Sequence, residues 1–455
     1  MSTSAPAASA RGAEPASIRE GLVTVLLGLS MVLVIMNTMM FNLALPSVAR
    51  DFGLSASSTS WIVTGYSIVF AISSITFSRL SDFVPIRRLI VIALLSLSLA
   101  AIAGLFSYSF LHLLVVRLVQ ASGAGAIPAL SLVLISRYIP LERRGKAMAM
   151  IMSAASLGLG LGPVAGGAIV EYLGWHHLFE VTAATLLLVP VFAALLPAEK
   201  PAKGSFDALG AFLVGVGTTG LLLFLTSRSV IALAAGLLGL VLFVFRVRTA
   251  RDPFVQPRLF GNRSYLLLSA VGIAAYLCSF ATLFLMPQIL VNLYGLSAIS
   301  SGLVIFPGSL LALFLSRQVG KIIDARGNAA IIRYIPLLVL ASVVLFALFA
   351  GTSYIAILLI YMLLSTGFTF LTSSISNEMS RILQPSQIGS GMGLFQLLQF
   401  FSGAFSVAAT ASALTWQKEL SPQAAYSNIY WAMAIVVLAS IACAYLYGRR
   451  ARQIA

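Results

Sequence analysis

One arginine lies inside an apolar stretch of this sequence, in the run LHLLVVRLVQASGAGAIPAL. Arg117 and Gln120 are three residues apart, so on a helix they share one face. An arginine near the centre of a membrane helix costs about 2.5–3.5 kcal/mol on insertion scales, so it normally faces a cavity or a partner inside the bundle. We predict that Arg117 and Gln120 form a central polar anchor or coupling site. The alternative is an arginine that only caps backbone carbonyls.

Neutral polar side chains in other apolar runs are further candidates for the same cavity. Gln396 and Gln399 share a helix face, whereas Asn37 and Asn42 are five residues apart and need not do so. Each of these groups can instead join neighbouring helices by hydrogen bonds without touching a ligand. The candidate cavity residues are Asn37, Asn42, Tyr66, Gln396 and Gln399.

Two short polar connections, SRLSDFVPIRR and RQVGKIIDARGN, each carry an acid followed by arginine. Such a loop can pair with neighbouring helix ends, and it can break and re-form these pairs when the helices move. We therefore predict a gate at the cytoplasmic side; the alternative is that the arginines only set membrane orientation. The gate residues are Asp82, Arg87, Arg88, Asp324 and Arg326.

The remaining acids avoid the centres of the apolar runs. Asp207 opens one run, where an acid also suits a helix N-terminus, and it is one further acid candidate. Proton-coupled carriers usually need a carboxylate that can face both sides of the membrane in turn. The sequence shows no obvious carboxylate of this kind.

A glycine-rich stretch, SLGLGLGPVAGG, lies inside a longer apolar run. Gly158, Gly162 and Gly166 repeat every four residues and form one bare stripe on a helix, which lets two membrane helices approach closely. Pro163 stands where a dinucleotide loop would need glycine, and a membrane helix tolerates it. We predict a helix interface that takes part in a conformational change, with packing alone as the alternative.

Metal and disulfide chemistry have little support in the sequence. Cys278 and Cys443 both lie in apolar runs, and the three histidines have no cysteine or acidic cluster at ligand spacing. No Walker motif is present, so ATP-driven pumping by this chain is unsupported. We expect no metal and no cofactor.

The elements that position these residues are membrane helices. Of the 455 residues, 60% are hydrophobic and only 9% are charged, which no soluble globular class combines at this length. Long apolar segments with almost no charge are typical of membrane spans. The fold class is therefore an all-α integral membrane protein.

Apolar runs separated by charged connections predict fourteen spans, which places both termini on one side. Nearly all of the 28 lysines and arginines fall in loops on that side, so both termini are expected in the cytoplasm. This distribution also explains the net charge of +15 without a nucleic-acid partner. The expected spans are 22–45, 61–80, 88–107, 110–136, 145–170, 177–196, 207–226, 229–246, 264–286, 300–316, 331–350, 354–376, 390–415 and 427–447.

The two acid–arginine loops lie eight spans apart, which indicates an internal repeat. Repeated halves around a central site are the architecture of many secondary transporters. We expect two six-helix bundles with an inserted helix pair between them. The expected parts are a cytoplasmic tail over 1–20, a first bundle over 21–200, the helix pair over 201–255, a second bundle over 256–448 and a cytoplasmic tail over 449–455.

Several motifs in order make a resemblance specific. They include NLALPSVARDF, SRLSDF, RYIPLERRGKA, GLGLGPVAGG, DPFVQP, VIFPG and VGKIIDARG. The chain resembles major facilitator superfamily exporters of the fourteen-span drug–proton antiporter type, in particular the class K and class L tetracycline efflux proteins. The resemblance implies the major facilitator fold and export of an amphipathic small molecule, a drug or antibiotic that includes tetracycline-like compounds. It also implies exchange for protons, alternating access, and a monomer in the lipid bilayer of a bacterial cytoplasmic membrane.

Departures from that pattern bear on the substrate. The intramembrane acids of the tetracycline exporters fall at Thr38, Leu159 and Gly403 of this chain, and the first acid–arginine loop begins with Ser78 and contains Pro85. A lining without those acids favours a neutral, weakly charged or anionic substrate. An exporter or facilitator of an endogenous metabolite without proton coupling is the alternative. A membrane enzyme or receptor would need a nucleophile–base set or a cofactor motif, and the spans contain neither.

Overall fold

Long helices make up the regular structure of this chain. The structure is a computed structural model that describes residues 19–54, 56–199 and 205–454. Within these ranges every regular element is a helix, and no strand occurs. Helices satisfy their own backbone hydrogen bonds, as apolar segments in lipid require. This result confirms the all-helical fold class that the composition predicted.

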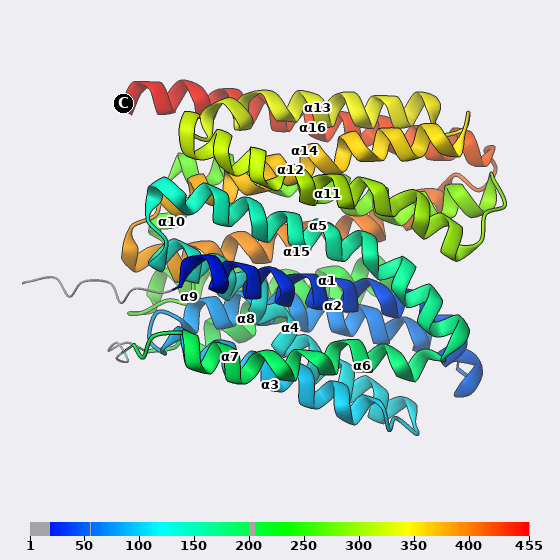
Figure 1. The fold of residues 1–455 in the computed structure, drawn as a ribbon, viewed down its shortest axis with the longest axis horizontal. Helices are drawn as coiled ribbons and strands as arrows, with labels where there is room; N and C mark the ends of the chain where they lie inside the picture. The colour runs from blue at the N-terminus through cyan, green and yellow to red at the C-terminus, as the bar shows by residue number, and fades with distance from the viewer. Residues whose placement is uncertain (1–18, 55, 200–204, 455) are drawn as a thin grey trace, which may run out of the picture.

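The first part of the chain extends from α1 through the helix pair α8–α9. Figure 1 shows that its long helices run nearly parallel to one another. The span expected at 177–196 consists of short consecutive helical pieces. The elements are α1 (Glu20–Asp51), α2 (Ala56–Leu80), α3 (Ile86–Gly104), α4 (Phe110–Tyr138), α5 (Leu141–Tyr172), η1 (Trp175–His177), α6 (Leu178–Ala183), η2 (Ala184–Leu187), α7 (Leu188–Leu195), α8 (Ala208–Ser227) and α9 (Val230–Thr249).

The second part of the chain begins with a short helix and ends in a long one. The C-terminal tail expected over 449–455 is helical as far as Ile454, because α16 continues through it. Residues 1–18 of the expected N-terminal tail lie outside the described residues. The elements are α10 (Arg258–Gly261), α11 (Arg263–Asn292), α12 (Ala298–Arg326), α13 (Ala329–Phe349), α14 (Tyr354–Ile382), η3 (Pro385–Gln387), α15 (Ile388–Trp416) and α16 (Pro422–Ile454).

The number of candidate spans is lower than the fourteen expected. In the described ranges, 12 helices are long and apolar enough to cross a membrane. A further span is counted only if the two parts of α12, which meet at a bend of 41°, form one crossing. The apolar part of α8, Ala208–Phe224, is too short to qualify. The bend and the short helix are the physical reasons why the predicted count is not reached.

Helices from the two parts of the chain occupy different regions of the bundle. In Figure 1, α1–α4, α6 and α7 gather in the lower region, and α11–α14 with α16 gather in the upper one. Helices α5 and α15 lie between these groups. Helix α1 begins and α16 ends at the same end of the bundle, on the left of Figure 1. We call this end the inner end, and the opposite end the outer end.

Two tyrosine–carboxylate contacts tie helix ends together at the inner end. The Tyr138 hydroxyl donates to Glu199, whose other oxygen accepts the first backbone N–H of α3 at 2.6 Å. The Tyr447 hydroxyl donates to Glu378 at 2.5 Å, and Glu378 also accepts from the Asn328 amide at 2.5 Å. Each contact therefore joins three segments of its own part of the chain.

Candidate functional site

Helix α4 places Arg117 in the interior of the bundle between two aromatic rings. The side chain is only 1% exposed. Its guanidinium carbon lies 3.8 Å from the ring centre of Phe41 and 4.0 Å from that of Tyr66. Such desolvated cation–π contacts stabilise a buried charge by about 2 kcal/mol or more. Phe41 was not among the predicted residues, because an aromatic residue in an apolar run carries no distinguishing signal.

Hydrogen bonds join Arg117 to several of the predicted cavity residues. The guanidinium donates to Gln120 Oε1 at 2.5 Å and to Asn37 Oδ1 at 3.4 Å. Asn37 in turn donates to the Tyr66 hydroxyl at 3.1 Å and accepts from the Thr182 hydroxyl at 3.0 Å. Three helices thus contribute neutral groups around one buried cation. Thr182 is a partner of Asn37 that the sequence did not reveal.

The Arg117 charge has no carboxylate partner among the described ion pairs. Its Nε atom and the Nε2 atom of Gln120 are buried and make no hydrogen bond. A buried charge with incompletely satisfied donors is costly unless another group pairs with it. We call Arg117, Gln120, Asn37 and Tyr66 the anchor cluster, and its chemistry suits a neutral or negatively charged acceptor group.

The glutamines of α15 are buried and only partly satisfied. Gln396 is 1% exposed and Gln399 is 0% exposed. Gln396 Oε1 and both amide atoms of Gln399 lack a hydrogen-bond partner. Buried amides are normally paired, so these groups need an explanation beyond helix packing. Asn42, by contrast, is exposed near the outer end of α1 and does not join the anchor cluster.

The α2–α3 connection places Asp82 in a network of charges at the inner end. Its carboxylate binds Arg79 at 2.6 Å and Arg137 at 3.1 Å. Burial raises the pKa of Asp82 above its ordinary value, and the hydrogen bond and charges of the two arginines act in the opposite direction. A Cβ added to Gly389 at the start of α15 would overlap this carboxylate, so the loop touches a helix from the second part of the chain.

The other predicted gate residues have different surroundings. Arg87 and Arg88 make none of the described ion pairs. The arginines that pair with Asp82 are Arg79 and Arg137 instead. Asp324 is exposed and lies against Gly145 in α5. The side chain of Arg326 lies outside the described residues. Each acid of the repeated loops therefore contacts the inner end of a helix from the other part of the chain.

The connection after α9 reaches the same network. Arg79 also donates to the carbonyl of Pro253 at 3.4 Å, and Gln256 donates to the carbonyl of Ser386 at 3.1 Å. The residues between α9 and α10 therefore contact both the end of α2 and the approach to α15. The sequence motif DPFVQP gave no indication of this position.

The glycine stripe of α5 forms a helix interface, and its partner is α1. Gly158 and Gly162 face Ile35, Met36 and Met39, and an added Cβ at Gly166 would come within 2.8 Å of the Met40 Cα. The contact with α12, on the other side of α5, uses Gly160 instead, which packs on Ser309. Pro163 is accommodated inside the continuous helix α5.

The contacts of Asp207 are those of a helix cap and an ion pair between helices. It is the N-cap of α8 and accepts the Gly210 backbone N–H at 3.0 Å. Its carboxylate also binds Arg246 of α9 at 3.1 Å and accepts the Phe254 backbone N–H at 3.2 Å. These contacts fasten the α8–α9 pair to the connection that follows it.

Thr38, Leu159 and Gly403, the positions that the sequence resemblance aligns with acids of the tetracycline exporters, have neutral surroundings. The Thr38 hydroxyl donates to its own helix at Val34 O, at 3.1 Å. Leu159 is buried at 5% exposure, and Gly403 packs against the Phe280 ring. No group of three or more His, Cys, Asp or Glu that could hold a metal ion occurs in the described part of the chain.

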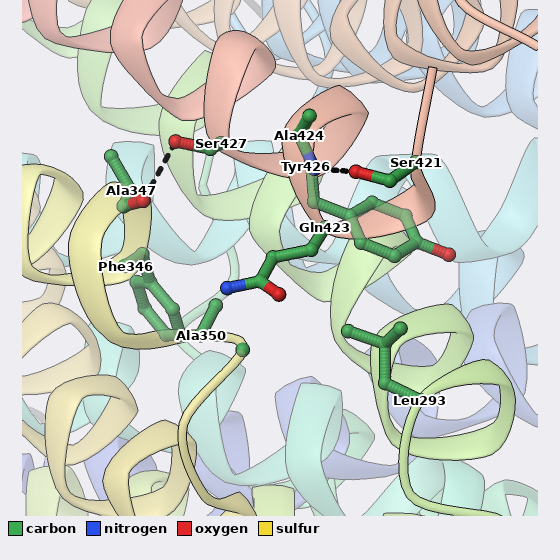
Figure 2. A pocket seen from close by; sticks show the side chains of 10 residues that line it. Leu293, Phe346, Ala347, Ala350, Ser421, Gln423, Ala424, Tyr426 and Ser427 are labelled. Atoms are coloured by element: carbon green, nitrogen blue, oxygen red, sulfur yellow. Dashed lines mark hydrogen bonds between the residues drawn. The ribbon is translucent and has the colours of Figure 1, made fainter. Parts of the chain in front are cut away.

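A separate cavity of about 280 Å³ lies at the outer end, between α11, α13 and α16. Figure 2 shows the amide of Gln423 between Phe346, Ala350 and Leu293. The Ser427 hydroxyl donates to the carbonyl of Ala347 at 2.7 Å and so joins α16 to α13. The cavity is not connected to the anchor cluster by any shared residue.

The sequence of this chain is similar to those of known proteins. The sequence model of one family, the Major Facilitator Superfamily, matches residues 27–407. The riboflavin transporter RibZ of Clostridioides difficile (strain 630) is 26% identical, over 90% of this chain and 93% of its own length. The lincomycin resistance protein LmrB of Bacillus subtilis (strain 168) is 27% identical, over 67% of this chain and 66% of its own length.

A solved structure has the same fold. The crystal structure of the human organic anion transporter MFSD10 superposes with a TM-score of 0.69, covering 92% of this chain and 99% of that one. The two sequences are 18% identical, so this likeness concerns the fold alone.

Proposed function

Because the chain belongs to the major facilitator superfamily, we propose that it is a secondary transporter that exports an amphipathic small molecule by alternating access, in exchange for protons. The observation that carries this proposal is the anchor cluster, in which a buried arginine with neutral partners retains unused donors. A membrane protein that keeps such a costly group in its interior normally uses it along a substrate or ion pathway.

The proposed architecture is a fourteen-span one, with six-helix bundles at 21–200 and 256–448 and an inserted pair at 201–255. Helix α1 begins and α16 ends at the inner end, which requires an even number of crossings. Helix α12 follows α5 from Val164 to Lys146 and so traverses the bundle despite its bend. An even total that includes α12 is reached when α8 is counted as well, and this supports the fourteen-span architecture.

The inner end is proposed to face the cytoplasm, with both termini there. The lysine and arginine distribution of the loops supports this orientation. The contacts of Asp82 with α15 and of Asp324 with α5 then act as a cytoplasmic gate between the two bundles. Opening toward the cytoplasm requires the helices to separate at both contacts.

The substrate is proposed to be a drug-like or antibiotic molecule, and tetracycline-like compounds are included in that class. The relatives named above include a lincomycin resistance protein and a riboflavin transporter, and both of the compounds in these names are sizeable polar organic molecules. The neutral residues at Thr38, Leu159 and Gly403 favour neutral or anionic molecules over dications. A metabolite exporter or facilitator without proton coupling is the second candidate, and the riboflavin transporter favours it.

Transport by the purified protein in proteoliposomes tests this proposal. A susceptibility panel in a bacterium that lacks its own pumps first identifies a substrate, with Arg117→Ala as the matched negative control. Uptake of that substrate into vesicles is then compared with and without an imposed pH gradient. Acceleration by the gradient is expected for proton exchange. Equal rates with and without the gradient would leave the uncoupled facilitator as the function.

A further inference from the structure

Five aromatic side chains in successive ring contact connect α2, α15, α11 and α14. Tyr66 and Phe70 of α2 stack with ring centroids 6.1 Å apart, and Phe70 meets Phe400 of α15 edge to face at 4.7 Å. Tyr276 of α11 then contacts Phe400 at 5.8 Å and Phe368 of α14 at 5.1 Å. We call these five residues the aromatic line.

The contact between Phe70 and Phe400 is the link of this line that joins the two parts of the chain. Tyr66 and Phe70 belong to α2, and the other three rings belong to helices that follow the α8–α9 pair. A movement that separates α2 from α15 therefore parts these two rings and leaves an aromatic face on each side. A flat aromatic molecule placed between them restores the edge-to-face and stacked contacts that rings prefer.

Unpaired amides accompany the line on α15. Gln396 precedes Phe400 by one helical turn, and Gln399 is its direct neighbour in the sequence. A Cβ added to Gly272, one turn before Tyr276, would lie 3.4 Å from Gln399 Nε2, so this amide faces α11 beside the line. Gln399 offers both a donor and an acceptor that nothing in the described structure uses. A ligand with a complementary acceptor and donor on one edge would satisfy them.

The charge next to the line is positive. The Arg117 guanidinium carbon lies 4.0 Å from the ring centre of Tyr66, the first ring of the line. None of the described ion pairs neutralises it. This charge at one end of the line disfavours a cationic ligand, whereas it does not disfavour a neutral or anionic one.

We propose that the aromatic line and the amides of Gln396 and Gln399 bind a flat aromatic molecule, neutral or anionic, that carries a donor and an acceptor on one ring edge, as an imide does. This inference rests on the proposed transport function and names the class of molecule transported. The ring lies between Phe70 and Phe400, and its polar edge meets Gln399.

Binding to the purified full-length protein tests the proposal with three probes. Lumichrome is flat, neutral and carries an imide edge, ethidium is flat and cationic, and cycloheximide carries an imide but no aromatic ring. We expect lumichrome to raise the melting temperature and to quench the protein fluorescence, with little effect of the other two. Equal or tighter binding of ethidium or cycloheximide would overturn the proposal.

Three variants separate the ligand contacts from general packing. Phe400→Leu and Gln399→Leu should each weaken lumichrome binding by roughly tenfold, about the effect of losing one aromatic or hydrogen-bond contact. Phe405→Leu on the same helix, where Phe405 is 39% exposed, should leave binding unchanged. Unchanged binding in both Phe400→Leu and Gln399→Leu contradicts the proposal.

The ligand-free protein gives a second readout for Gln399. Because its amide is unpaired, Gln399→Leu should raise the melting temperature without ligand while it lowers the shift produced by lumichrome. A purely structural glutamine would lower the melting temperature instead. Transport of other substrates without lumichrome binding overturns only this inference, whereas lumichrome binding without any transport overturns only the proposed function.

Discussion

The Ser78 hydroxyl at the end of α2 donates a 2.7 Å hydrogen bond to the carbonyl of Gly389 at the start of α15, 311 residues further along the chain. The Asp82 carboxylate lies on the same glycine. Side chains of the end of α2 and of the α2–α3 connection therefore contact the backbone of α15 at the inner end. A transporter that opens at this end must break these contacts.

Gly389→Ala should destabilise the closed inner end. The new methyl group would overlap Asp82 and the Ser78 carbonyl, and overpacking of this kind typically costs about 1–3 kcal/mol. We expect a lower melting temperature in detergent and slower transport. Gly448→Ala in α16 is the matched control, because nothing lies within 4 Å of the added Cβ there. Equal melting temperatures for the two variants would contradict the close contact at Gly389.

Asp82→Asn should open the inner end without changing side-chain size. The variant weakens the hydrogen bond that the carboxylate accepts from the Gly389 backbone of α15, and it loses the ion pairs with Arg79 and Arg137 that position the carboxylate there. Hydrogen bonds to charged groups contribute about 1.5–3 kcal/mol each. Ser78→Cys, in a background without Cys278 and Cys443, reports the opening through its reaction with a water-soluble maleimide. We expect labelling roughly tenfold faster with Asp82→Asn.

Arg88→Gln is the control for that experiment. Arg88 is exposed and makes none of the described ion pairs, so its loss should leave the labelling rate at Ser78→Cys unchanged. Faster labelling with Arg88→Gln than with Asp82→Asn would support the pairing suggested by the sequence over the pairing in the structure.

Arg117→Lys should slow transport strongly although it keeps the charge. Lysine keeps the charge but loses the planar group that lies over Phe41 and Tyr66, and a desolvated cation–π contact contributes about 2 kcal/mol or more. We expect at least roughly tenfold slower transport with near-normal protein levels in the membrane. Arg333→Lys, at an exposed contact with Tyr334, should transport normally. Normal transport by Arg117→Lys would falsify the role of the planar group.

Gly166→Ala should weaken the contact between α5 and α1. Its Cβ would come within 2.8 Å of the Met40 Cα, a backbone atom that cannot rotate away, and we expect a loss of about 1–3 kcal/mol in stability. Gly28→Ala on the facing side of α1 would meet Ala154 at 3.7 Å, an ordinary contact, and should be tolerated. A lower melting temperature for Gly166→Ala than for Gly28→Ala is expected of a tight interface, and equal melting temperatures would contradict it.

Local sequence features predicted the residues of the anchor cluster but not all of their partners. The spacing of Arg117 and Gln120 put both on one helix face, and the structure joins them directly. Asn37 and Tyr66 were candidates and contact the same arginine, whereas Phe41 was not. Polar residues stand out in apolar runs because their burial is costly. An aromatic residue in such a run gives no comparable signal.

The sequence by itself determined the helices and the faces that they present, because helix formation in lipid follows from apolar length and the positions on a face follow from the helical period. Only the tertiary structure decided what each face meets. The glycine stripe packs on α1, Asp82 pairs with Arg79 and Arg137, and Phe70 touches Phe400. These contacts depend on how all the helices pack at once, so no spacing along a single segment specifies them.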